Sequence, residues 1–144
     1  MNISLKGKRA LIGGSSRGLG LAVAKQLAYS GASVTLMSRN ENKLKDIVYS
    51  LEKETNNNHS YLVVDFNNFN SFKKTILSFL KKNEIDILVN NTQGPKSGDI
   101  ESLLIQDYQN AFDLLFKSFV FSTISALPYM KKNNWGRILN MVSI

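Results

Sequence analysis

The first pattern in the chain that could do chemistry is a glycine-rich turn, "GGSSRGLG". Gly14, Gly18 and Gly20 give the spacing G-x-x-x-G-x-G, after a short apolar run and before a helical pattern. Glycines let the backbone turn tightly and approach a pyrophosphate closely, and the following helix offers free N–H donors at its positive end. Because the turn joins a strand to a helix, we expect a dinucleotide-phosphate loop; the alternative is an ordinary glycine-rich turn.

Two arginines indicate which dinucleotide the loop would hold. The second strand pattern ends at Ser38 and Arg39, where a fold selective for NAD usually places Asp or Glu for the ribose 2′-hydroxyl. The guanidinium fork matches phosphate oxygens, and Arg17 in the loop could reach the same group. The pattern favours NADP(H) over NAD. The alternative is that both arginines are simply solvated.

The elements that must position these residues alternate between strand and helix. Several strands are apolar on both faces, which is typical of a parallel sheet covered by helices on both sides. Right-handed crossovers make this a doubly wound α/β sheet, and we interpret residues 1–144 as one domain. On the first helix we expect Leu19, Val23 and Leu27 to face inward. The expected strands are 9–14, 32–39, 60–66, 85–91 and 136–142, and the expected helices are 18–31, 40–54, 68–83 and about 100–132, the last broken near Asp107.

Composition narrows the class of protein. The 144 residues include 43% hydrophobic residues and no Cys, so disulfides and Cys-based metal sites are excluded, and we expect no metal. The start of the chain resembles neither a signal peptide nor a membrane span, which favours a cytoplasmic protein with no membrane partner. The net charge of +7 suits an anionic partner or a solvated lysine-rich surface. Its scattered basic residues do not favour nucleic acid, and we place His59, the only histidine, on the surface.

Four segments in order are similar to motifs of the short-chain dehydrogenase/reductase family. The loop resembles its T-G-x-x-x-G-[IL]-G, with Gly13 where Thr is usual. "VVDFN" resembles the third-strand segment in which Asp contacts the adenine, and "LVNNTQG" resembles the N-N-A-G segment. "ALPYMKKNNWGRILNMVS" resembles the end of the fourth helix and the fifth strand. The likeness covers the whole chain, and within the family it is greatest to 3-oxoacyl-acyl-carrier-protein reductases.

This resemblance implies a Rossmann-type doubly wound sheet, here truncated after the fifth strand. It also implies hydride transfer between NADP(H) and a carbonyl or alcohol carbon of a small or carrier-bound substrate, in a protein that is a homo-oligomer at full length. Ser143 is the implied catalytic serine. The implied cofactor-binding residues are Gly14, Ser16, Arg17, Gly18, Leu19, Gly20, Ser38, Arg39, Asp65, Phe66, Asn91 and Thr92.

Two departures from the family pattern limit the expected activity. The family has Tyr-x-x-x-Lys about a dozen residues after the serine, but this chain ends at Ile144, and Leu115 stands where the family often has an Asn of the proton relay. We therefore expect the first part of a longer protein or a truncated copy, inactive alone. Three hypotheses stay open: the cofactor-binding part of a reductase, an NADP(H)-binding module without turnover, and a remnant that does not fold stably.

Overall fold

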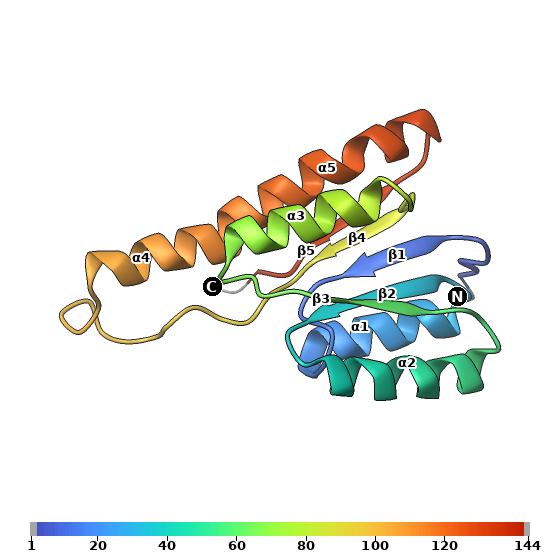
Figure 1. The fold of residues 1–144 in the computed structure, drawn as a ribbon, viewed down its shortest axis with the longest axis horizontal. Helices are drawn as coiled ribbons and strands as arrows, with labels where there is room; N and C mark the ends of the chain where they lie inside the picture. The colour runs from blue at the N-terminus through green and yellow to red at the C-terminus, as the bar shows by residue number, and fades with distance from the viewer. Residues whose placement is uncertain (1–2, 143–144) are drawn as a thin grey trace.

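The computed structural model describes residues 3–142 and contains a five-stranded parallel sheet (Figure 1). The strand order is β3-β2-β1-β4-β5, so the chain builds outward from β1 first to one side and then to the other. This is the Rossmann-like order that the sequence predicted. The strands are β1 (Arg9–Ile12), β2 (Ser33–Ser38), β3 (Ser60–Val63), β4 (Ile87–Asn90) and β5 (Arg137–Asn140).

Helices cover both faces of the sheet. The helices α1 (Gly18–Tyr29) and α2 (Glu41–Thr55) lie on one face, and α3 (Phe69–Leu80) and α5 (Ser118–Lys132) lie on the other (Figure 1). Successive residues of a strand point to opposite faces. Ala10 and Ile12 accordingly belong to the core beneath α1 and α2, while Leu11 belongs to the core beneath α3 and α5.

The buried face of α1 differs from the prediction by one residue. Leu19 is 69% exposed, and the residues that the helix buries are Gly20, Ala24 and Ala28. Both sets recur every four residues, so helical periodicity alone cannot choose between them. The structure buries the small residues because they allow the helix to approach the strands closely, and Val23 and Leu27 pack at the border of that contact.

The last helical stretch begins later than predicted and has no break near Asp107. Helix α4 (Ile105–Ala111) runs through a π-helical turn, η1 (Phe112–Lys117), directly into α5. Asp107 starts the helix, since its carboxylate accepts the backbone N–H of Leu104 at 2.9 Å. In Figure 1, α4 and the preceding loop extend beyond the end of the sheet.

The continuous helix Ile105–Lys132 is long and apolar enough, by length and composition, to cross a membrane. Its α5 part nevertheless forms one layer of the α/β fold, and Ser118, Ser122, Ala126 and Met130 are buried there. Core helices of proteins without a membrane span pass the same test of length and composition. We therefore assign it as a helix of the sheet's covering layer.

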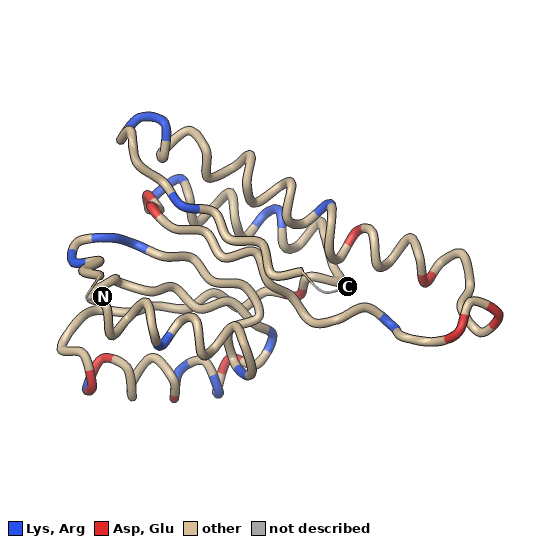
Figure 2. The backbone as a smooth tube through the Cα atoms, turned by 180° about the vertical axis from the view of Figure 1, so that it is seen from behind, with Lys and Arg blue, Asp and Glu red and all other residues tan. Residues whose placement is uncertain are grey.

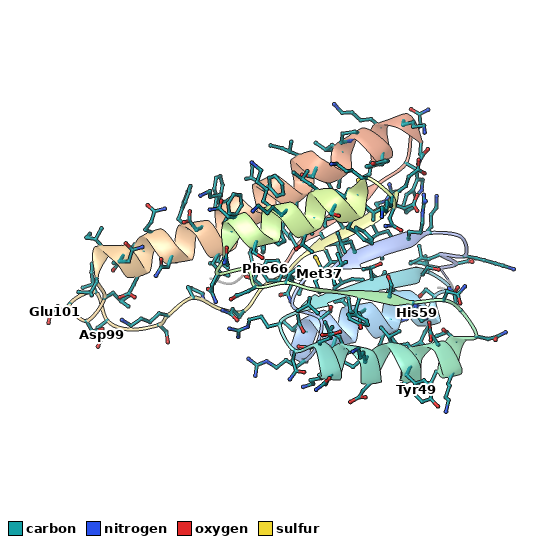
Figure 3. The ribbon with its side chains drawn as sticks, in the orientation of Figure 1. Met37, Tyr49, His59, Phe66, Asp99 and Glu101 are labelled. Carbon is teal, nitrogen blue, oxygen red and sulfur yellow. The ribbon has the colours of Figure 1, made fainter. Side chains whose placement is uncertain are left out.

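His59 is buried, and its predicted surface position was wrong. The ring is 8% exposed and lies between the end of α2 and the start of β3 (Figure 3). Its Nδ1 accepts the Val34 N–H at 3.1 Å, and its Nε2 lies 2.8 Å from the Thr55 hydroxyl. Burial lowers the pKa of His59, and the nearby Glu52 carboxylate opposes that shift. The neutral imidazole ring thus links the end of α2 to β2 through its two nitrogen atoms.

Candidate dinucleotide-binding cleft

A cleft of about 470 Å³ lies at the carboxyl ends of β1, β2 and β4. The chain leaves β1 toward β2 and later returns to place β4 on the other side, so this is the point where strand order reverses. Open α/β sheets bind ligands at such a point. The lining residues are Gly14, Ser16, Arg17, Gly18, Leu19, Gly20, Ser38, Arg39, Asn40, Lys43, Val64, Phe66, Asn91, Thr92 and Gln93.

The glycine loop has the backbone geometry that the motif predicted. Gly14 and Gly18 have φ angles of 55° and 56°, a backbone conformation that residues with a side chain rarely adopt. At Gly20, a Cβ would lie 2.7 Å from Asn91 Nδ2 and 2.9 Å from the Gly13 carbonyl oxygen, and closer still to the Gly14 oxygen. Helix α1 therefore begins nearer to the loop than any side chain at this position allows.

Ser15 holds the loop against β2, a role that sequence reasoning missed. Its hydroxyl donates to the Ile12 carbonyl at 2.9 Å and accepts the Met37 N–H at 2.9 Å, and its own N–H donates to the Met37 carbonyl. The side chain is fully buried. Ser15 thus replaces the strand pairing that β2 loses where β1 ends. The only signal in the sequence was a hydroxyl inside the glycine turn.

Asn91, which directly follows β4, supports the glycine loop. Its side-chain amide donates to the Gly13 carbonyl at 3.1 Å. The backbone of Asn91 lies so close to Gly13 that a Cβ there would overlap the Asn91 carbonyl oxygen. This contact gives a physical reason for Gly13 where the resembling family has Thr.

Asn90, the neighbour of Asn91, ties the site to the other layer. Its side chain is buried, and its amide donates to Thr123 Oγ1 at 3.1 Å and to Asn140 Oδ1 at 2.8 Å. These two bonds fix β4 to α5 and to the end of β5. The edge strand β5 is thereby held next to the cleft.

The cleft is electropositive. Three cations, Arg17, Arg39 and Lys43, are among its lining residues, and among residues 3–142 no carboxylate lines it. The first turn of α1 carries no acidic residue. In the part of the chain that the structure describes, the buried Ser38 hydroxyl has no hydrogen-bond partner. Cations together with an unpartnered hydroxyl suit a ligand with anionic oxygens.

The predicted cofactor-binding residues come together in this cleft with one exception. Asp65 is not among the lining residues; its carboxylate instead accepts the Asn67 N–H at 3.0 Å and caps the turn before α3. Ser143 lies outside the described residues. Sequence reasoning did not assign Asn40, Lys43, Val64 or Gln93 to the site. Phe66, which lines the cleft, belongs to the same buried cluster as Met37 (Figure 3).

An apolar hollow of about 880 Å³ adjoins the cleft and shares Leu19, Asn91, Thr92 and Gln93 with it. Leu115, at the position of the family's relay Asn, lines this hollow from η1. Its other lining residues are Gly94, Pro95, Phe116, Phe119, Val120, Thr123, Ile124, Asn140, Met141 and Val142. None of these residues, all between 3 and 142, is a Tyr or Lys that could serve as a proton donor.

A Tyr-x-x-x-Lys pattern does occur at Tyr49 and Lys53, but on the outer surface of α2 (Figure 3). Tyr49 is 61% exposed, and Lys53 Nζ lies 4.1 Å above its ring. Neither residue lines the cleft or the apolar hollow. This pair therefore makes a surface cation–π contact and has no access to a substrate beside the glycine loop.

Comparison with known proteins finds similar sequences along nearly the whole chain. The family model described as short chain dehydrogenase matches residues 8–144. An uncharacterized oxidoreductase of Staphylococcus epidermidis is 31% identical over 97% of this chain and 60% of its own length. A 3-oxoacyl-[acyl-carrier-protein] reductase of Chlamydia pneumoniae is 31% identical over 100% of this chain and 58% of its own length.

Solved structures agree with the observed topology. The L-sorbose reductase of Gluconobacter frateurii, complexed with NADPH and L-sorbose, matches with a TM-score of 0.91 at 28% identity, over 100% of this chain and 55% of that one. The 3-oxoacyl (acyl-carrier-protein) reductase of Agrobacterium tumefaciens with NADP bound matches with a TM-score of 0.88 at 28% identity. This match covers 98% of the present chain and 54% of that one. The chain thus spans between half and two thirds of the length of these relatives.

Proposed function

The chain belongs to the short-chain dehydrogenase family, and on this premise we propose that its cleft binds NADP(H). The observation that carries the proposal is the wall of the cleft. Within the described residues 3–142, it combines Arg17, Arg39 and Lys43 with the unpartnered Ser38 hydroxyl and contains no carboxylate. A 2′-phosphate would gain charge-assisted hydrogen bonds there, whereas an unphosphorylated ribose would find no acceptor of the kind that NAD-selective sites supply.

In this proposal each part of the loop has a separate task. Gly14, Gly18 and Gly20 let the backbone and the start of α1 face the pyrophosphate, and Ser16 borders it. Asn91 and Thr92 lie where the cleft meets the apolar hollow, so they would border the nicotinamide end. Phe66 and Val64 would flank the adenine. Bound NADP(H) would supply the hydride chemistry.

The proposed reaction is reduction of a carbonyl group, or oxidation of an alcohol, by the protein of which residues 1–144 form the cofactor-binding domain. The apolar hollow beside Leu115 would receive the substrate, which we propose to be acyl-like, as in the 3-oxoacyl reductase among the relatives. Ser143 would hold the carbonyl oxygen.

A second candidate function is NADP(H) binding without turnover. The observation in its favour is the lack of a Tyr or Lys among the residues, within 3–142, that line the apolar hollow. Loss of a positioned proton donor lowers a rate by about 10²- to 10⁴-fold. NADPH binding with no oxidation of NADPH over a panel of 3-oxoacyl substrates would favour this candidate.

The proposal is tested by replacing Arg39 with Ala and measuring the dissociation constants of NADPH and NADH by calorimetry. A hydrogen-bonded charge pair contributes about 1.5–3 kcal/mol, so NADPH affinity should fall about tenfold to a hundredfold. NADH affinity should stay constant. Arg137→Ala is the matched control, because Arg137 is exposed at the far end of β5. An unchanged NADPH/NADH ratio in Arg39→Ala would show that the NADP assignment is wrong.

A further inference from the structure

We infer that Lys43 is a specificity-determining residue that binds the 2′-phosphate of NADP(H) from the first turn of α2, opposite Arg39. This inference rests on the proposed function and names a residue that neither the glycine motif nor the end of β2 indicated. Lys43 is carried into the same cleft as Arg17, Arg39 and Ser38.

The start of α2 directs Lys43 toward the cleft. Asn40 caps this helix, and its side-chain oxygen accepts the Lys43 N–H at 3.0 Å. Side chains of a helix point back toward its N-terminus. The Lys43 side chain therefore extends toward the end of β2, where Ser38 and Arg39 lie, and the rigid cap fixes its starting point.

The charge of Lys43 is available to a ligand. Lys45, two residues along on nearly the opposite side of the helix, is paired with Glu41 at 2.9 Å. No carboxylate between residues 3 and 142 lies within 4.0 Å of Lys43 Nζ. Glu41 is the acid nearest in sequence, and besides Lys45 it accepts the Tyr61 hydroxyl at 3.2 Å. Its charge is thus balanced away from the cleft. Figure 2 shows the other basic residues spread over the chain rather than gathered in one stripe.

The Ser38 hydroxyl, on which the proposed function also rests, indicates that a polar ligand belongs here. Its side chain is 8% exposed, yet its hydroxyl has no partner in the described part of the protein. A buried hydroxyl without a hydrogen bond is costly, and such groups in native sites commonly receive a partner from a ligand or water. A phosphate oxygen between Arg39 and Lys43 would accept from the Ser38 hydroxyl.

The test compares two nucleotides that differ only in the 2′-phosphate, 2′,5′-ADP and 5′-AMP, as probes in calorimetric titrations. The proteins are the wild type, Lys43→Ala, Lys43→Arg and the matched control Lys45→Ala. Lys43→Ala should lower the affinity for 2′,5′-ADP about three- to tenfold and leave that for 5′-AMP unchanged. Lys43→Arg should restore the preference, because it retains the charge, and Lys45→Ala should behave as wild type.

The outcomes separate this inference from the proposed function. If the wild type prefers 2′,5′-ADP but Lys43→Ala and Lys45→Ala bind it equally, the Lys43 assignment is overturned while NADP(H) binding stands. If the wild type binds neither nucleotide, or binds both equally, the proposed function fails and the Lys43 assignment fails with it. Equal losses for both nucleotides in Lys43→Ala would also overturn the assignment, because they would indicate a general effect on the cleft.

Discussion

Replacement of Gly20 by Ala tests the geometry of the phosphate loop most severely. The added Cβ would lie 2.7 Å from the Asn91 side chain and 2.9 Å from the Gly13 carbonyl oxygen, with the Gly14 oxygen closer still. Two of these three neighbours are backbone atoms, which cannot rotate away. Because the Gly14 oxygen is the nearest of the three, ordinary van der Waals contact is reached only if the loop moves by roughly one ångström.

The expected magnitudes follow from this displacement. Overpacking of a closely packed site costs about 1–3 kcal/mol, and for a chain of this size the melting temperature should fall by roughly 3 °C per kcal/mol. A shift of the same order can misplace ligand-binding groups enough to cost about a hundredfold in function. We therefore expect Gly20→Ala to melt several degrees lower and to bind NADPH at least about tenfold more weakly.

Differential scanning calorimetry and NADPH titration measure these two effects. Gly94→Ala is the matched control, because a Cβ at Gly94 meets no atom within 4 Å and Gly94 borders the neighbouring apolar hollow. It should keep the wild-type melting temperature and NADPH affinity. If Gly20→Ala also kept both, the close approach of α1 to the loop would not be a requirement of the site, and the reasoning would be refuted.

Two further predictions concern residues that support the site. Because burial lowers the pKa of His59, the folded state binds its proton less readily than the unfolded state, whose pKa is near 6.5. The unfolding free energy should therefore have its full value above about pH 6.5 and should fall as the pH drops below about 6.5. Denaturant titrations at several pH values should show this pH dependence in the wild type and not in His59→Gln. Ser15→Ala should lower the unfolding free energy by about 1–3 kcal/mol, because the buried Met37 N–H loses its acceptor; an unchanged denaturation midpoint would contradict that role.

The alternation of strands and helices was readable from the sequence because each apolar run ends in a recognisable signal. The glycine turn closes β1, and Asn40 and Asn68 cap the helices that follow β2 and β3. Parallel pairing and right-handed crossovers then leave few topologies. The buried face of α1 was missed by one residue because Leu19 is large and apolar, yet it lies at the mouth of the cleft.

Residues of the candidate site could be predicted where a sequence motif encodes the backbone geometry. Residues whose position depends on tertiary contacts could not. In the sequence Lys43 is one basic residue among many, and only the folded start of α2 brings it to the wall of the cleft that Arg39 also lines. His59 stands in an Asn-rich segment that favours a surface loop, but the structure buries its ring, whose Nδ1 accepts the N–H of Val34, 25 residues earlier, and whose Nε2 lies beside the Thr55 hydroxyl. Asp65 was assigned to the adenine by family resemblance; its carboxylate caps the turn before α3, and its contact with a cofactor stays a prediction.

The central claim is that the cleft at the ends of β1, β2 and β4 holds a phosphorylated dinucleotide. The most direct measurement is a calorimetric titration of the 144-residue chain with NADPH and, separately, with NADH. The account predicts one site per chain and NADPH binding at least about tenfold tighter than NADH, given the charge-assisted bonds available to the 2′-phosphate. Equal affinities, or no binding of either cofactor by a chain that unfolds cooperatively, would contradict it.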